Sequence, residues 1–359
     1  MDSFIFALSA VAPIVLAVVV GYFFKKIGMM DEDFAKKANK LVFRAFMPVM
    51  LFVKIYKMSL SDVDLGFIGF CLISLFIIFA VSVPACMIIA GKKDRVGVLV
   101  QAIFRSGYSL IGIPLAGSLF GEEGELAATI LSAALIPCFN VLAVISLSAL
   151  GNDSGAKISP KKIVLDIIKN PLIIGIFAAL VCVAIRTFIL VPAGISFQLS
   201  NITPLFQVLQ YLADLAIPLA LLVLGAQFEF SAVAALKKEI IFGTLTRTVI
   251  VPALVLGVAF IFFRDRFSAA QFATLVAAFA TPVAVPSVPM VQEMGGDVTL
   301  AGQLVVWSTL VSSIFISPIG IMVSSIKTFN FSLCASICFK ICVLATFILS
   351  SNCSFFSSK

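Results

Sequence analysis

The sequence predicts an all-α integral membrane protein with ten transmembrane helices, arranged as two inverted five-helix repeats in which helices 4 and 9 are broken and cross. Hydrophobic residues make up 61% of the 359 residues and charged residues only 12%. The mean hydropathy is +1.17, far outside the balance of a soluble domain. Apolar runs of about 20 residues recur along the chain, and each could cross a hydrocarbon core about 30 Å thick. Two of these runs carry matching proline-rich interruptions.

The apolar runs divide the chain into ten expected spans. Their ranges are 4–24, 38–57, 66–90, 97–120, 126–149, 168–190, 204–227, 239–263, 269–294 and 299–325. The longest polar connection, GNDSGAKISPKK at 151–162, separates five spans from five. We therefore expect a first repeat at 1–150, a cytoplasmic linker at 151–167 and a second repeat at 168–326.

The remaining C-terminal residues, 327–359, form an atypical tail. Its apolar stretch at 331–349 has Lys340 in the middle, which makes it a poor eleventh span, so we expect an accessory helix. Cys334, Cys338 and Cys342 share one helical face, but no histidine accompanies them. No metal site is expected there.

The charged residues predict the orientation in the membrane. The net charge is +7, but the basic residues lie in short connections between spans, where they act as topology signals and do not indicate nucleic acid binding. Placing the N-terminus outside puts most of them on the inner side and leaves Lys54, Lys57 and Arg186 among the outer ones. No basic segment precedes the first span, which is expected to be a mature helix. We expect a multi-pass protein of the plasma membrane.

An internal repeat supports the division into halves. The segment FRSGYSLIGIPLAGSLFGEEGELA at 104–127 aligns with FATPVAVPSVPMVQEMGGDVTLAG at 279–302, pairing Phe104 with Phe279 and Pro114 with Pro289. Because each half has an odd number of spans, the second half enters the membrane in the opposite sense. Inverted repeats with broken helices are typical of secondary transporters, whose substrate sites lie near the bilayer midplane.

The interruptions are GYSLIGIP at 107–114 and TPVAVPSVP at 281–289. Proline removes a backbone donor and clashes with the preceding turn, so both stretches should break their helices. Broken backbone at membrane depth is tolerated only against protein or beside a wet cavity. The freed amides at the start of each half-helix could then face an anion. Ordinary proline kinks are the alternative.

The expected substrate-binding residues lie in and beside these interruptions. They are Arg105, Gly107, Tyr108, Ser109, Gly112, Ile113, Pro114, Pro282, Val285, Pro286, Ser287 and Pro289. Arg105 could supply a fixed positive charge for a carboxylate. Equally, it could extend to the inner interface, with only its aliphatic stem in the membrane.

Three further charges within spans are candidates for coupling or for ion pairs, because charges are rare at this depth. Arg44 and Asp214 lie four residues before Pro48 and Pro218, and this matched placement suggests a structural pair. Asp214 could instead couple transport to protons. Arg247 lies deep enough in its span to need a partner.

The sequence lacks the constellations of an enzyme. It contains no histidine, which excludes Ser-His-Asp catalysis and histidine metal sites. Neither paired catalytic aspartates within spans nor a Walker-type glycine loop is present. We therefore expect no enzymatic activity, no cofactor and no ATP-driven transport.

Several motifs resemble one known family. TPVAVPSVPMVQEMGGD, LAGQLVVWSTLVSSIFISPIG, FRSGYSLIGIPLAGSLFG, FRAFMPVMLF and TRTVIVPAL occur in an order and spacing similar to those of auxin efflux carriers, in the bile/arsenite/riboflavin-type transporter superfamily. The resemblance covers about residues 4–325. It implies a scaffold and a transport domain, elevator-like alternating access, extracellular termini and homodimers. Its crossover loops would fall on 107–114 and 282–289, with Gly107 where relatives commonly carry Asn.

These observations predict a secondary active transporter of a small organic anion, such as a malate-like or auxin-like carboxylate. Transport would be proton-coupled or electrochemically driven. A sodium-coupled symporter and, further off, a non-transporting receptor are the alternatives. The expected partners are the anion, H⁺ or Na⁺, the lipid bilayer and a second copy of the chain.

Overall fold

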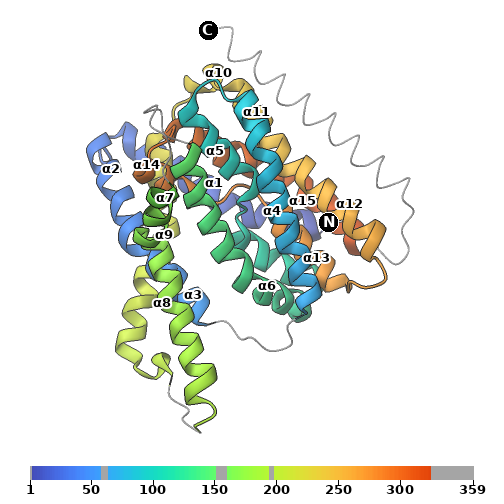
Figure 1. Ribbon diagram of the computed structural model, residues 1–359. Helices are drawn as coiled ribbons and strands as arrows, with labels where there is room; N and C mark the ends of the chain where they lie inside the picture. Colours follow the sequence, from blue (N-terminus) through green and yellow to red (C-terminus); the bar gives the residue numbers. More distant parts are fainter. Residues whose placement is uncertain (1, 58–63, 151–159, 194–197, 325–359) are drawn as a thin grey trace.

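The computed structural model describes residues 2–57, 64–150, 160–193 and 198–324, and this part of the chain is almost entirely helical (Figure 1). No strand is present in these ranges; the only extended pairing within them is one isolated bridge. The expected tail at 327–359 lies outside the described residues, and so does 151–159 of the expected linker. Residues 160–167 of the expected linker lie in a helix from Pro160 to Lys169, and the division into repeats and linker stays a prediction.

The helices are as follows. The first part of the chain contains α1 (Asp2–Lys26), α2 (Glu32–Leu41), η1 (Val42–Phe46), α3 (Met47–Tyr56), α4 (Leu65–Ile89), α5 (Lys93–Phe104), η2 (Tyr108–Gly112) and α6 (Ile113–Leu150). The second part contains α7 (Pro160–Lys169), α8 (Pro171–Ile185), η3 (Arg186–Leu190), η4 (Leu199–Asn201), α9 (Thr203–Gln227), α10 (Ala232–Ala235), α11 (Lys237–Leu245), η5 (Thr246–Ile250), α12 (Val251–Phe263), α13 (Ala269–Phe279), α14 (Ser287–Met294) and α15 (Val298–Ser324).

Five helical stretches of the described chain are long and apolar enough to cross a membrane. They are Leu65–Ile89, Tyr108–Leu150, Pro171–Leu190, Thr203–Gln227 and Lys237–Phe263. In the most apolar 18-residue stretch of Leu65–Ile89, only 17% is buried inside the protein. Exposed apolar surface of this extent is unfavourable in water but suits lipid. The fold is therefore that of a multi-pass membrane protein, whereas the division into ten spans stays a prediction.

Proline determines where the long helices change geometry. The wide π-helical turns η1, η2, η3 and η5 each end two residues before a proline, at Pro48, Pro114, Pro192 and Pro252. A proline ring clashes with the carbonyl one turn earlier and offers it no N–H. Widening the preceding turn relieves this clash, and such turns often lie at functional sites.

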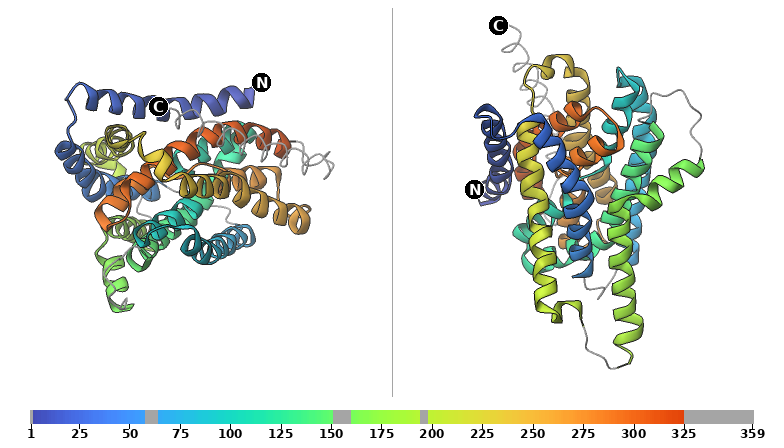
Figure 2. Two further views of the ribbon diagram at one scale, coloured as in Figure 1. Left: turned by 90° about the horizontal axis from the view of Figure 1, so that it is seen from above. Right: turned by 90° about the vertical axis from the view of Figure 1, so that its left-hand side faces the viewer.

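Two sets of helices pack on either side of the broken segments. On one side α1 packs against α9, and α3 against α8 and α9; on the other, α13 and α5 pack against α6, and α4 against α5. Figure 1 shows α8 and α9 towards one side of the molecule, α4 in the middle of the view and α12 towards the opposite side. Both views of Figure 2 place α1 along the outside of the bundle, where it also contacts α15.

Candidate functional site

Two half-helices end near one another in the interior. Helix α5 ends at Phe104 and α13 ends at Phe279, the two residues that the internal repeat aligns. The chain is irregular at 105–107 (the first break) and at 280–286 (the second break) before η2 and α14 begin. Pro114 and Pro289 were expected to break their helices, but they lie in the first turns of α6 and α14. Pro289 is tolerated there because the N–H groups of an open first turn have no partner within the helix, whereas Pro114 follows η2 directly and is accommodated by that widened turn.

The two breaks cross and bond to one another, and together we call them the crossing. Ser106 and Val283 form an antiparallel bridge. The Gly107 N–H donates to the Pro282 carbonyl at 2.7 Å, and the Ala284 N–H donates to the Arg105 carbonyl at 3.3 Å.

A hydroxyl from α15 completes this pairing, since the Val283 N–H donates to Ser308 Oγ at 3.0 Å. Three amides of the crossing are thus bonded within the protein. These three amides are therefore not available to an anion, whereas the expectation that amides at the start of each half-helix face an anion stays a prediction.

Arg247 lies beneath the crossing, on η5, and is fully buried. Its Nε donates to the Thr281 carbonyl at 2.9 Å and its Nη2 to the Ala278 carbonyl at 3.1 Å. Its Nη1 donates to the carbonyls of Ile103 and Phe104 at 3.1 and 3.4 Å. The residue was expected to need a partner, and its hydrogen-bond partners are backbone carbonyls; it forms no salt bridge with a carboxylate of the described residues.

A small cavity lies at the crossing, with a volume of about 50 Å³. Of the residues expected to bind substrate, it is lined by Arg105, Gly107, Tyr108, Ser109, Pro282, Val285 and Pro286. The others, Gly112, Ile113, Pro114, Ser287 and Pro289, do not line it. Gly112 instead packs against α13, because an added Cβ would meet the Ala277 carbonyl oxygen at 2.7 Å. The cavity is far below the roughly 300–1,000 Å³ of an ordinary ligand pocket, so it must widen to admit an organic acid.

Arg105 is the charged residue of this cavity and is only 4% exposed. The interpretation in which it extends to the membrane surface is therefore wrong. Its Nη2 donates to Asn140 Oδ1 at 2.8 Å and its Nη1 to Met290 Sδ at 3.2 Å. No carboxylate of the described residues forms a salt bridge with it. Arg105 is thus a buried charge held by one amide and one weak thioether acceptor.

The polar groups around Arg105 differ in their availability. Tyr108 donates its hydroxyl to the Ala128 carbonyl at 2.6 Å, which ties that group to α6. The side-chain oxygens of Ser106 and Ser287 are buried and have no hydrogen-bond partner within the described residues. Of these two serines, only Ser106 lines the cavity.

Two polar residues of the site were not expected from the sequence. Asn140 on α6 is 2% exposed and was not expected, because it is uncharged and lies outside both interruptions. Lys54 was placed in an outer connection, yet it lies on α3 and its Nζ donates to Ser109 Oγ at 3.2 Å. Lysine at a span end is a common topology signal, so no sequence feature indicated a contact with Ser109.

Arg44 and Asp214 do not pair with one another, and that interpretation is wrong. Arg44 Nε contacts Glu293 Oε2 on α14 at 3.0 Å. Asp214 accepts a hydrogen bond from Gln210 Nε2 at 2.7 Å, one turn earlier on α9. Their matched distances from prolines reflect similar positions along two spans, not a contact.

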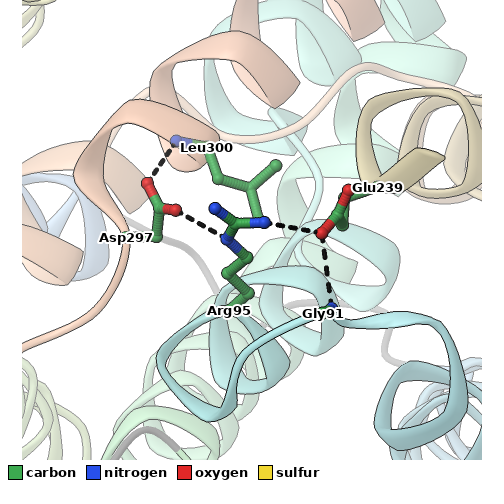
Figure 3. Close-up of polar contacts among 5 residues, drawn as sticks. All are labelled: Gly91, Arg95, Glu239, Asp297 and Leu300. Carbon is green, nitrogen blue, oxygen red and sulfur yellow. Dashed lines mark hydrogen bonds and ion pairs between the residues drawn. The ribbon is translucent and has the colours of Figure 1, made fainter. Parts of the chain in front are cut away.

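An ion cluster holds the beginning of α5, the half-helix that leads to Arg105 (Figure 3). Arg95 Nη1 contacts Glu239 Oε1 on α11 at 2.8 Å, and Arg95 Nε contacts Asp297 Oδ2 at 2.9 Å. Asp297 also accepts from the Leu300 N–H at 2.9 Å at the start of α15, and Glu239 accepts from the Gly91 N–H at 3.4 Å. The cluster therefore links α5, α11 and the start of α15.

The fold and the crossing together define a class: a multi-pass membrane protein with two broken helices that meet in a buried, polar interior. Residues 6–319 match the family of membrane transport proteins, and the chain belongs to this family, the auxin efflux carriers.

Two archaeal relatives are also named as transporters. The chain is similar to an uncharacterised transporter of Methanothermobacter thermautotrophicus, with 24% identity over 310 residues that cover 84% of this chain and 93% of the relative. It is similar to another of Methanocaldococcus jannaschii, with 28% identity over 252 residues that cover 67% and 75%.

Proposed function

We propose that this chain is a secondary active carrier that moves a small organic anion, a carboxylate, through alternating access at the crossing. The observation that carries the proposal is Arg105, a guanidinium 4% exposed and without a carboxylate partner in the described chain. A buried charge costs several kcal/mol unless it is paired. Neither the amide of Asn140 nor the thioether of Met290 neutralises it. A carboxylate substrate would supply the missing charge, because guanidinium binds carboxylate through two parallel hydrogen bonds.

The surroundings of Arg105 suit the head group of such an acid. The unpartnered hydroxyl of Ser106 lies in the same cavity, and hydroxyls donate readily to carboxylate oxygens. Beyond these groups the cavity wall is apolar, with Met50 on α3, Ile14 on α1 and Ile217 on α9. One side of this wall therefore comes from α1, α3 and α9, while the other side, with Ile136 and Phe139 on α6, lies with the charge at the end of α5.

The charge lies at the end of α5, while one side of the apolar wall lies on α1, α3 and α9, and this arrangement favours an elevator-type mechanism. In the proposal, α1, α3, α8 and α9 belong to a scaffold, and the broken helices move past it with the substrate. The half-helices α5 and α13 end at residues that the repeat aligns, which supports ten spans in two inverted repeats. The basic inner connections support an N-terminus outside the cell, and the family supports a plasma-membrane homodimer with coupling to H⁺ or to the membrane potential.

Uptake by proteoliposomes tests the proposal. A panel of labelled monocarboxylates, dicarboxylates, amino acids and indole acids would be offered under a proton gradient, a sodium gradient or a membrane potential, each imposed separately. We expect saturable uptake of at least one carboxylate, lost in Arg105→Gln. Stimulation by sodium alone would favour the symporter. Binding without uptake under every gradient would make the protein a receptor and overturn the proposal.

A further inference from the structure

The Ile103, Phe104, Ala278 and Thr281 carbonyls form a group that we call the carbonyl cage. Ile103 and Phe104 are the last two residues of α5, Ala278 lies in the last turn of α13, and Thr281 follows that helix. The last carbonyls of a helix have no partner within the helix and carry its negative dipole end. All four oxygens lie 2.9–3.4 Å from nitrogens of one side chain, Arg247.

We propose that Arg247 is a positioning residue that acts as a built-in cation, filling the carbonyl cage and holding the crossing in register without a bound coupling ion. This inference rests on the proposed function, because it concerns how the transport site is held. It goes further by excluding a coupling cation from the carbonyl cage. In transporters with broken helices, such freed carbonyls and helix ends commonly coordinate Na⁺.

The shape of the guanidinium explains why arginine is suited to this role. It is planar, always charged, and presents five donors in a fixed fork. Nε and Nη2 serve the α13 side, while Nη1 serves the α5 side. A lysine ammonium is a compact point charge on a flexible stem, so it could reach one helix end but not span both.

The carbonyl cage adjoins the binding groups along both chains. Phe104 immediately precedes Arg105, and Thr281 immediately precedes Pro282, whose carbonyl accepts from the Gly107 N–H. Arg247 therefore fixes the backbone one residue away from the proposed anion site. It is fully buried and does not line the cavity, so it acts on substrate only through these neighbours.

Chemical rescue of the purified protein tests the role. Arg247→Gly removes the side chain, and Thr246→Gly, on the same turn, is the matched control for glycine in a helix. Melting of each variant in detergent would be followed in guanidinium, sodium or choline chloride at equal, non-denaturing ionic strength, with urea as a further control. We expect guanidinium, and none of the others, to raise the melting temperature of Arg247→Gly by several degrees relative to Thr246→Gly and the wild type.

Arg247→Lys keeps the test decisive if the glycine variant does not fold. We expect this variant to fold, to melt below the wild type and to bind anion at least tenfold more weakly, because one helix end is released and Arg105 shifts. Wild-type uptake should be the same in sodium and in choline. Equal rescue by sodium, wild-type affinity in Arg247→Lys, or sodium-dependent uptake would each overturn the inference. Melting requires no substrate, so a failure of the proposed function alone would leave the rescue intact.

Discussion

Replacing Arg105 by glutamine should make the empty protein more stable while removing its ability to bind anion. The effective cost of a buried, unpaired charge is several kcal/mol, and the charge-assisted bond to Asn140 at 2.8 Å returns only about 1.5–3 kcal/mol. Glutamine keeps a neutral donor, worth about 1 kcal/mol. The net gain is about 1–3 kcal/mol, or roughly 2–6 °C at the lower end of the usual scale for large domains.

Binding should change in the opposite direction. Removing one partner of a buried, hydrogen-bonded charge pair costs about 2–5 kcal/mol, equivalent to a roughly 30- to 3,000-fold weaker affinity at 1.4 kcal/mol per tenfold. Thermal melting in detergent, with and without each carboxylate, measures both effects because a ligand that binds the folded state raises the melting temperature.

Asn140→Asp provides a matched variant at the same contact. A carboxylate placed 2.8 Å from Arg105 Nη2 would neutralise the charge internally, so this variant should also gain stability and lose anion binding. If Arg105→Gln melted several degrees lower and still bound the anion with unchanged affinity, the guanidinium would be a structural group. The reasoning would then be refuted.

The other expectations concern the packing around the crossing. Gly107→Asn introduces the residue common in relatives and should fold normally, because a Cβ there would lie 3.4 Å from the nearest atom, the Pro282 oxygen, and the backbone φ is −72°. Anion affinity should shift about 2- to 10-fold for one hydrogen bond. A loss of folded protein on size-exclusion chromatography would contradict this expectation. Gly112→Ala should lower the stability by about 1–3 kcal/mol, since its Cβ would meet the Ala277 carbonyl oxygen at 2.7 Å. Gly257→Ala is the control and should be neutral, because an added Cβ there has nothing within 4 Å. Equal melting temperatures of the two variants would disprove the close contact. Arg95→Ala should lower the stability by about 3–5 kcal/mol, because it leaves the carboxylates of Glu239 and Asp297 uncompensated. Adding Glu239→Gln to this variant should restore part of the lost stability. An unchanged melting temperature in Arg95→Ala would show that the cluster contributes little.

The sequence located the interruptions because proline chemistry is local. A ring that lacks an N–H clashes with the turn before it wherever a helical turn precedes the proline, and the aligned segments at 104–127 and 279–302 place two such interruptions at matching positions. The boundaries were less accurate: Pro114 and Pro289 begin their half-helices, while the irregular backbone lies at 105–107 and 280–286.

The partners of the buried charges could not be predicted, because they depend on tertiary packing. Asn140 is 35 residues from Arg105 in the chain, and nothing local distinguishes it from other polar residues in the spans. Arg247 was expected to need a partner because it lies deep in its span, but backbone carbonyls carry no sequence signature, so these partners could not be predicted. Lys54 resembled a topology signal, whereas its contact with Ser109 depends on the tertiary packing that brings α3 to η2.

A structure with a bromine-labelled carboxylate bound tests the central claim most directly, since the anomalous signal of bromine would locate the ligand independently of the fold. The account predicts a carboxylate within hydrogen-bonding distance of Arg105 and Ser106 Oγ, in a cavity widened beyond its present 50 Å³, with its body against Met50 and Ile217. A bromine position elsewhere, such as the cleft of about 640 Å³ beside Lys25 and Gln227, with the crossing unchanged and empty, would contradict it.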